Sequence, residues 1–78
     1  MTERKSYEIL SMEALNTARW LGLPRYFKHN ASGGSYWATE VVYREADMVQ
    51  CVSYTPHGWP GTIFIRPLDE FLTKFIAE

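Results

Sequence analysis

The chain has 78 residues, of which 46% are hydrophobic, and eight Lys and Arg against nine Asp and Glu leave a formal charge of -1. This length predicts a single domain over residues 1–78, with residues 1–6 loosely held. The near-neutral charge excludes a general electrostatic attraction to nucleic acid or to an anionic membrane. One cysteine cannot form an intrachain disulfide, and no apolar run reaches the length of a signal peptide or a membrane span. We therefore expect a cytoplasmic protein without a membrane partner.

A first helix is predicted over residues 11–21. Ser11 is a favourable capping residue, Gly22 suits the left-handed position that ends a helix, and Pro24 stops its continuation. The segment before it, residues 7–10, is predicted either as a short strand or as the lead-in to this helix. The apolar residues expected on one face of the helix are Ala14, Leu15, Ala18 and Leu21.

Four short strands follow, over residues 25–29, 35–45, 48–54 and 62–66. The turn before the second strand contains Gly33 and Gly34, and residues 55–61 form a loop with two prolines and two glycines. The two-residue alternation along the second strand predicts a shared face for Trp37, Thr39, Val41 and Tyr43.

The last element carries the most regular apolar pattern in the chain. Pro67 suits the first position of a helix, and Asp69 and Glu70 would lie in its first turn. The apolar residues that recur at helical spacing are Leu68, Phe71, Leu72, Phe75 and Ile76. Together, these elements predict an α+β domain with an N-terminal helix, a small curved antiparallel sheet of about four strands that approaches a barrel, and a C-terminal amphipathic helix.

Three segments of the chain carry a family resemblance. They are residues 25–28 (Arg-Tyr-Phe-Lys), residues 52–54 (Val-Ser-Tyr), and residues 63–68 (Ile-Phe-Ile-Arg-Pro-Leu) followed by Phe71. In these segments the chain resembles a small domain family of bacterial and phage genomes that has no known function. The resemblance implies a compact, mostly β fold and no established activity.

Catalytic chemistry has little support in the sequence. Cys51 with His29 or His57 would make a thiolate–imidazolium pair, but Cys51 lies in an apolar β run, where a free cysteine is usually a buried hydrophobe. Two histidines and one cysteine without a cluster of acids are a poor ligand set for a metal. We therefore expect no catalytic residue, no metal site and no cofactor.

Arg66 is the candidate for anion binding, because it ends an apolar strand and a guanidinium binds carboxylates and phosphates well. The competing interpretation is an ion pair within the chain, to Asp69 or Glu70. A third role, as part of a small-ligand or enzyme site, would combine Arg66 with His57 and Cys51.

Aromatic residues are the main indication of binding. Three tryptophans, five tyrosines and four phenylalanines are more than a core of this size can enclose, so some must lie at the surface. Trp59 lies between Pro56 and Pro60, which stiffen its loop, and the competing interpretation is that it folds back as a lid over the core. The candidate protein-binding residues are Trp59, Trp37, Tyr36, Tyr43, Tyr54 and His57.

Segment 19–29 offers an alternative, because cations and aromatic rings alternate there as they do in proteins that bind single-stranded nucleic acid. The candidate residues are Arg19, Arg25, Lys28, Tyr26 and Phe27. We expect a non-catalytic protein-interaction module, of the kind a phage uses as an accessory or inhibitory protein to block a host complex. The alternatives are a weak nucleic-acid-binding domain and, because self-association also covers aromatic surface, a homodimer.

Overall fold

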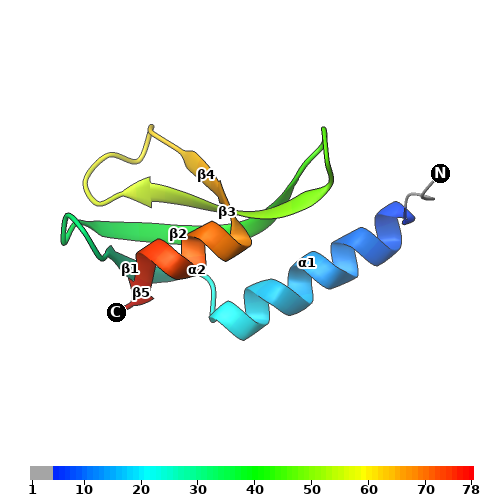
Figure 1. The fold of residues 1–78 in the computed structure, drawn as a ribbon, viewed down its shortest axis with the longest axis horizontal. Coiled ribbons are helices and arrows are strands. Elements are labelled where there is room, and N and C mark those ends of the chain that lie inside the picture. Colours follow the sequence, from blue (N-terminus) through cyan, green and yellow to red (C-terminus); the bar gives the residue numbers. More distant parts are fainter. Residues whose placement is uncertain (1–4) are drawn as a thin grey trace.

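The computed structural model describes residues 5–78, which form two helices and five strands (Figure 1). In chain order they are α1 (Tyr7–Leu21), β1 (Arg25–His29), β2 (Ser35–Arg44), β3 (Val49–Pro56), β4 (Phe64–Pro67), α2 (Leu68–Lys74) and β5 (Phe75–Ala77). The strands form one antiparallel sheet in the order β4-β3-β2-β1-β5. The predicted α+β class is confirmed.

The sheet is open, so the prediction of a barrel-like sheet of about four strands is wrong in closure and in strand number. Its two edges are β4 and β5. α2 runs from one of these edge strands directly into the other and contacts β3 on the way. The helix therefore crosses one face of the sheet and connects its two edges.

The first helix begins at Tyr7, four residues earlier than predicted, and Ser6 caps it. The Ser6 hydroxyl accepts a hydrogen bond from the Ile9 N–H at 3.3 Å. Gly22 ends the helix in the left-handed conformation, as predicted. Residues 1–4 of the segment predicted to be loose lie outside the described residues, whereas Lys5 forms an ion pair with Glu13 at 2.7 Å.

The predicted shared face of the second strand is wrong, because β2 contains a bulge. Its pairing with β3 shifts between Ala38 and Glu40, and the extra residue reverses the alternation. Trp37 therefore lies on the opposite face from Val41 and Tyr43. Val41 belongs to the buried core, and the Tyr43 hydroxyl donates to the Leu10 carbonyl at 2.8 Å.

The end of the chain also differs from the prediction. α2 stops at Lys74, and residues 75–77 form β5, which pairs with β1. Phe75 keeps its place in the core because it lies on the covered face of this strand, but Ile76 is exposed. Pro67 pairs with Cys51 at the end of β4 and precedes the helix instead of occupying its first turn.

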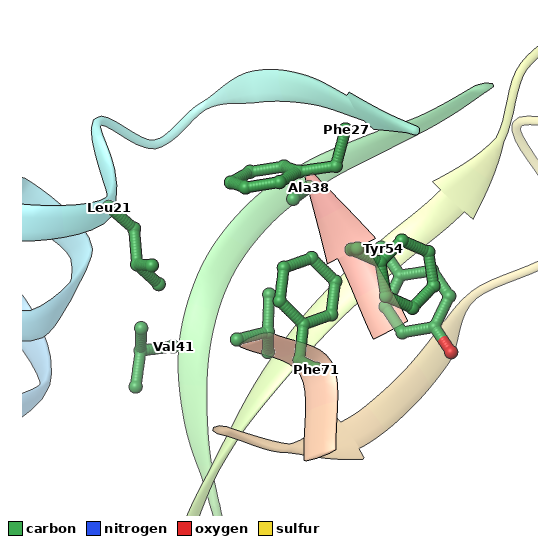
Figure 2. Close-up of a cluster of buried hydrophobic side chains, with 8 residues drawn as sticks. Leu21, Phe27, Ala38, Val41, Tyr54 and Phe71 are labelled. Carbon is green, nitrogen blue, oxygen red and sulfur yellow. The ribbon is translucent and has the colours of Figure 1, made fainter. Parts of the chain in front are cut away.

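The core lies on the inner face of the sheet, which we define as the side that α1 and α2 cover. Figure 2 shows Phe71 of α2 between Phe27 of β1 and Tyr54 of β3. The ring of Phe71 stacks on Phe75 at 4.4 Å between centroids and meets Phe27 edge-on at 5.0 Å. Burial of one such ring contributes roughly 1.5–3 kcal/mol, so this cluster contributes substantially to stability.

Candidate functional site

The outer face of the sheet, opposite the helices, carries a small aromatic cluster. Tyr26 of β1 pairs across the strands with Trp37 of β2, and their ring centroids are 4.7 Å apart. The Tyr26 hydroxyl lies 3.3 Å from Nδ1 of His57, the first residue after β3. The His57 N–H donates to the Ser35 carbonyl at 3.0 Å, which fixes the start of the following loop to β2. Tyr26 and Trp37 both remain exposed.

The loop after β3 consists of two consecutive tight turns that share Trp59. The Trp59 N–H donates to the Pro56 carbonyl at 3.0 Å, and the Trp59 carbonyl accepts from the Thr62 N–H at 3.1 Å. Gly58 has φ 87°, which the third position of a type II turn requires. The backbone of Trp59 is thus held on both sides, while its side chain is 70% exposed. The competing interpretation of Trp59 as a lid over the core is therefore wrong.

We call Tyr26, Trp37, His57 and Trp59 the aromatic loop surface. A hollow of about 170 Å³ lies beside it, lined in part by Tyr26, Trp37, His57 and Pro60. Pockets for drug-sized ligands are larger, at roughly 300–1,000 Å³. A hollow of this size, bordered by aromatic rings and proline, suits one inserted side chain of a protein partner.

Exposed apolar residues also lie at the β4 edge of the sheet. Ile65 of β4 pairs with Ser53 and lies on the outer face, and Ile63 is also exposed, whereas Phe64 pairs with Tyr54 and lies on the inner face. The apolar character of this edge extends the area available to a partner beyond the aromatic loop surface.

The other predicted protein-binding aromatics lie on the inner face. Tyr54 is only 4% exposed, and its ring packs against Phe71 and Phe75. Tyr36 is half-buried and packs edge-on against Tyr54. Tyr43 is half-buried between α1 and β3. These three tyrosines belong to the packing of the domain and contribute little to an accessible surface.

The structure does not bring the predicted nucleic-acid-binding residues together. Phe27 is 3% exposed, so a base cannot stack on it. Arg25 donates to the carbonyls of Leu21 and Glu78, which joins the end of α1 to the end of the chain. Tyr26 and Lys28 lie on the outer face, whereas Arg19 lies on α1.

Arg66 forms the predicted ion pair within the chain. Its Nη1 atom lies 2.9 Å from Oε1 of Glu70, and its Nε atom donates to the Tyr54 hydroxyl at 3.1 Å. The hydrogen bond to Tyr54 raises the pKa of the Arg66 guanidinium. The guanidinium also lies 5.6 Å from the centre of the Phe75 ring. A hollow of about 220 Å³ borders the Arg66 guanidinium. The guanidinium already binds Tyr54 and Glu70 of the same chain, so it offers fewer donors to an external anion.

A groove between α1 and the β2–β3 hairpin was not predicted from the sequence. Its volume is about 390 Å³, and its lining includes Leu10, Ala14, Val41 and Met48. The Tyr43 hydroxyl in its wall is already hydrogen-bonded to the Leu10 carbonyl and to Gln50, while Tyr7, Ser11 and Glu45 also line the groove. The sequence analysis missed this groove because it began the helix at residue 11, whereas Tyr7 and Leu10 of α1 also line the groove.

Cys51 is fully buried, as is typical of a free cysteine within a strand. Within residues 5–78 there is no group of three or more His, Cys, Asp or Glu that could hold a metal ion. In the same part of the chain, no helix is both long and apolar enough to cross a membrane.

Comparison with protein-family models, with curated proteins and with solved structures finds no match to the chain. The resemblance to a domain family of bacterial and phage genomes therefore stays a prediction.

Proposed function

We propose that this protein is a non-catalytic interaction module that binds a protein partner through the aromatic loop surface. The observation that carries the proposal is Trp59, whose side chain is exposed while its backbone N–H and carbonyl are both hydrogen-bonded within the loop. A large ring on an ordered backbone loses little conformational entropy on binding, and tryptophan is among the residues that contribute most at interfaces.

The surroundings of Trp59 support a protein partner. Tyr26, Trp37 and His57 form a packed group beside the loop, so a partner would meet a rigid surface. The small hollow beside them accepts one side chain, which is how hot-spot residues of two proteins often fit together. A module of this kind acts by occupying a surface that another protein needs, so we propose inhibition of a protein complex as its mode of action.

Nucleic-acid binding is the second candidate, and one observation favours it. Lys28 lies on the same face as Tyr26 and Trp37, so a single cation stands close to two exposed rings. One phosphate contact supplies little affinity at physiological salt, because the electrostatic contribution grows with the number of contacts. The protein-binding proposal therefore has the stronger support.

The experiment is an affinity capture from a lysate of the organism that encodes the chain, with and without nuclease. The bait proteins are the wild type, Trp59→Ala and the matched control Trp20→Ala. Trp20 is 71% exposed, almost as much as Trp59, but it lies on α1. Circular dichroism confirms that all three baits are folded.

We expect a stoichiometric protein partner that survives nuclease, is lost with Trp59→Ala and is kept with Trp20→Ala. Truncation of a central interface tryptophan costs about 2–4 kcal/mol, a loss of roughly 30-fold or more in affinity. Equal capture by wild type and Trp59→Ala would contradict the proposal. Nuclease-sensitive capture that disappears at high salt and with Lys28→Glu would instead support nucleic-acid binding.

A further inference from the structure

α1 carries a second apolar stripe, on the side away from the sheet. Its covered side presents Leu10, Ala14, Ala18 and Leu21, which are buried or packed against the core. The other stripe consists of Ile9, Met12, Asn16 and Trp20, which recur at i, i+3, i+7 and i+11 and so share one helix face. We call these four residues the outer α1 stripe.

Residues 5–78 leave the apolar side chains of the outer α1 stripe exposed to solvent. Ile9 is 47% exposed and Met12 is 59% exposed, and Trp20 is the most exposed of the three. A surface helix normally has one apolar face and one polar face, whereas a helix with apolar residues on both sides is usually covered on both sides. In the view of Figure 1, none of the helices and strands formed by residues 5–78 lies against the side of α1 away from the sheet.

Opposite charges lie at the two ends of this stripe. Glu8 is in the first turn of α1 and Arg19 is in the last turn. The two residues are eleven positions apart, about three helical turns, so they lie along the same side of the stripe. Neither takes part in an ion pair within the described residues, whose ion pairs are Lys5–Glu13, Arg44–Asp47 and Arg66–Glu70.

This charge pattern is complementary to itself only in one direction. In an antiparallel pair of α1 helices related by a two-fold axis, Met12 lies opposite Asn16 of the second copy. In the same register Ile9 approaches Trp20 of the second copy, and Glu8 approaches Arg19 of the second copy. A parallel two-fold pair would instead place the charges of the two copies on opposite flanks of the contact, so that Glu8 of one copy would not meet Arg19 of the other.

We propose that the outer α1 stripe is a self-association surface whose occupant is a second copy of this chain, with the two α1 helices antiparallel. The proposal goes beyond the proposed function, because it concerns α1 and does not involve the aromatic loop surface. The contact is small beside the roughly 800 Å² per partner of a standard interface, so we expect a weak dimer with a Kd on the order of 50 µM.

The test is sedimentation velocity of the full chain from about 5 µM to about 500 µM, a range that brackets the expected Kd. The wild type should shift from monomer to dimer. Met12→Glu should remain monomeric, because it places a charge in the centre of the contact. Leu72→Glu is the matched control, since Leu72 is an exposed leucine on α2, and it should dimerise as the wild type does. Trp59→Ala should also dimerise, which separates this proposal from the proposed function.

Charge reversal tests the antiparallel direction. Glu8→Lys and Arg19→Glu should each weaken dimerisation by about tenfold, because each converts two equivalent attractive contacts into repulsive ones. The double variant Glu8→Lys/Arg19→Glu should restore the wild-type Kd to within about threefold. A wild type that stays monomeric at the highest concentration would overturn the proposal, as would dimerisation of Met12→Glu equal to wild type. Failure of the double variant to recover would overturn the antiparallel arrangement.

Discussion

The Tyr26 hydroxyl lies 3.3 Å from Nδ1 of His57, so a side chain of β1 is linked to the loop that follows β3. The link crosses β2, because Trp37 lies between the two strands and packs against Tyr26. The start of the Trp59 loop is therefore tied to the sheet by a contact between segments far apart in the sequence. This relationship can be tested without changing Trp59 itself.

Tyr26→Phe should loosen the loop while leaving the fold intact. The variant keeps the ring that packs on Trp37 and removes only the hydroxyl that meets His57. We expect amide hydrogens in the loop, above all that of Trp59, to exchange faster, and the free energy of unfolding to fall by no more than about 1 kcal/mol. Hydrogen exchange followed by NMR measures the first and urea denaturation the second. Unchanged exchange at Trp59 would show that the two turns hold the loop without Tyr26.

Tyr43→Phe should weaken the attachment of α1 to the sheet. The Tyr43 hydroxyl donates to the Leu10 carbonyl at 2.8 Å and accepts from Nε2 of Gln50 at 3.1 Å. Its removal leaves a partly buried donor and acceptor without their partner, which costs about 1–3 kcal/mol of unfolding free energy. Tyr7→Phe is the matched control, because Tyr7 is almost fully exposed, and it should change stability by less than about 0.5 kcal/mol. Equal denaturation midpoints for the two variants would contradict this role of Tyr43.

Local signals predicted the parts of the fold that depend on nearby residues. The strand Arg25–His29 and the end of α1 at Gly22 agree with the prediction, because a left-handed glycine and a following proline act within a few residues. The bulge at β2 could not be predicted in this way. The two-residue alternation continues through Thr39 in the sequence, and only the pairing with β3 shows where an extra residue is inserted.

β5 was missed for a related reason. Phe75 and Ile76 continue the helical spacing that starts at Leu68, so the local pattern favours one long helix. The strand forms instead because it pairs with β1, a contact that the sequence of the segment does not encode. The candidate site shows the same limit. Trp59 and its stiff loop were predicted from Pro56 and Pro60. The contact between Tyr26 and His57 was not predicted, because it depends on the order of the strands in the sheet.

Asp47 should make stability depend on pH at acidic values. Nε and Nη2 of Arg44 donate to its carboxylate, the shorter contact being 2.6 Å, and this hydrogen-bonded pair lowers the pKa of Asp47 from its ordinary value of 3.8. A carboxyl whose pKa is lower in the folded state stabilises the fold fully above pH 3.8. That contribution is lost as the pH falls below 3.8 and through the lowered pKa.

The measurement is urea denaturation of wild type, Asp47→Asn and Arg44→Gln at a series of pH values. The wild type should be more stable than Asp47→Asn near neutral pH, and the difference should shrink once the pH falls below 3.8. Arg44→Gln should reduce the same pH dependence, because it removes the group that holds the pKa of Asp47 low. A constant difference between wild type and Asp47→Asn at all pH values would contradict the assignment.

Gly58→Ala should disturb the aromatic loop surface through the backbone alone. Gly58 adopts φ 87°, and a Cβ added there would meet no heavy atom within 4 Å, so any effect comes from conformational strain. The left-handed conformation costs a residue with a side chain roughly 1–2 kcal/mol. We expect Gly58→Ala to lose about that much stability if the turn persists, or to lose partner binding if the turn rearranges.

Gly61→Ala is the matched control, because Gly61 lies in the same loop with equally open space and does not have a positive φ. Calorimetric melting and the affinity capture together separate the two effects. If Gly58→Ala and Gly61→Ala were equally stable and bound the partner equally well, the first turn would not be what positions Trp59.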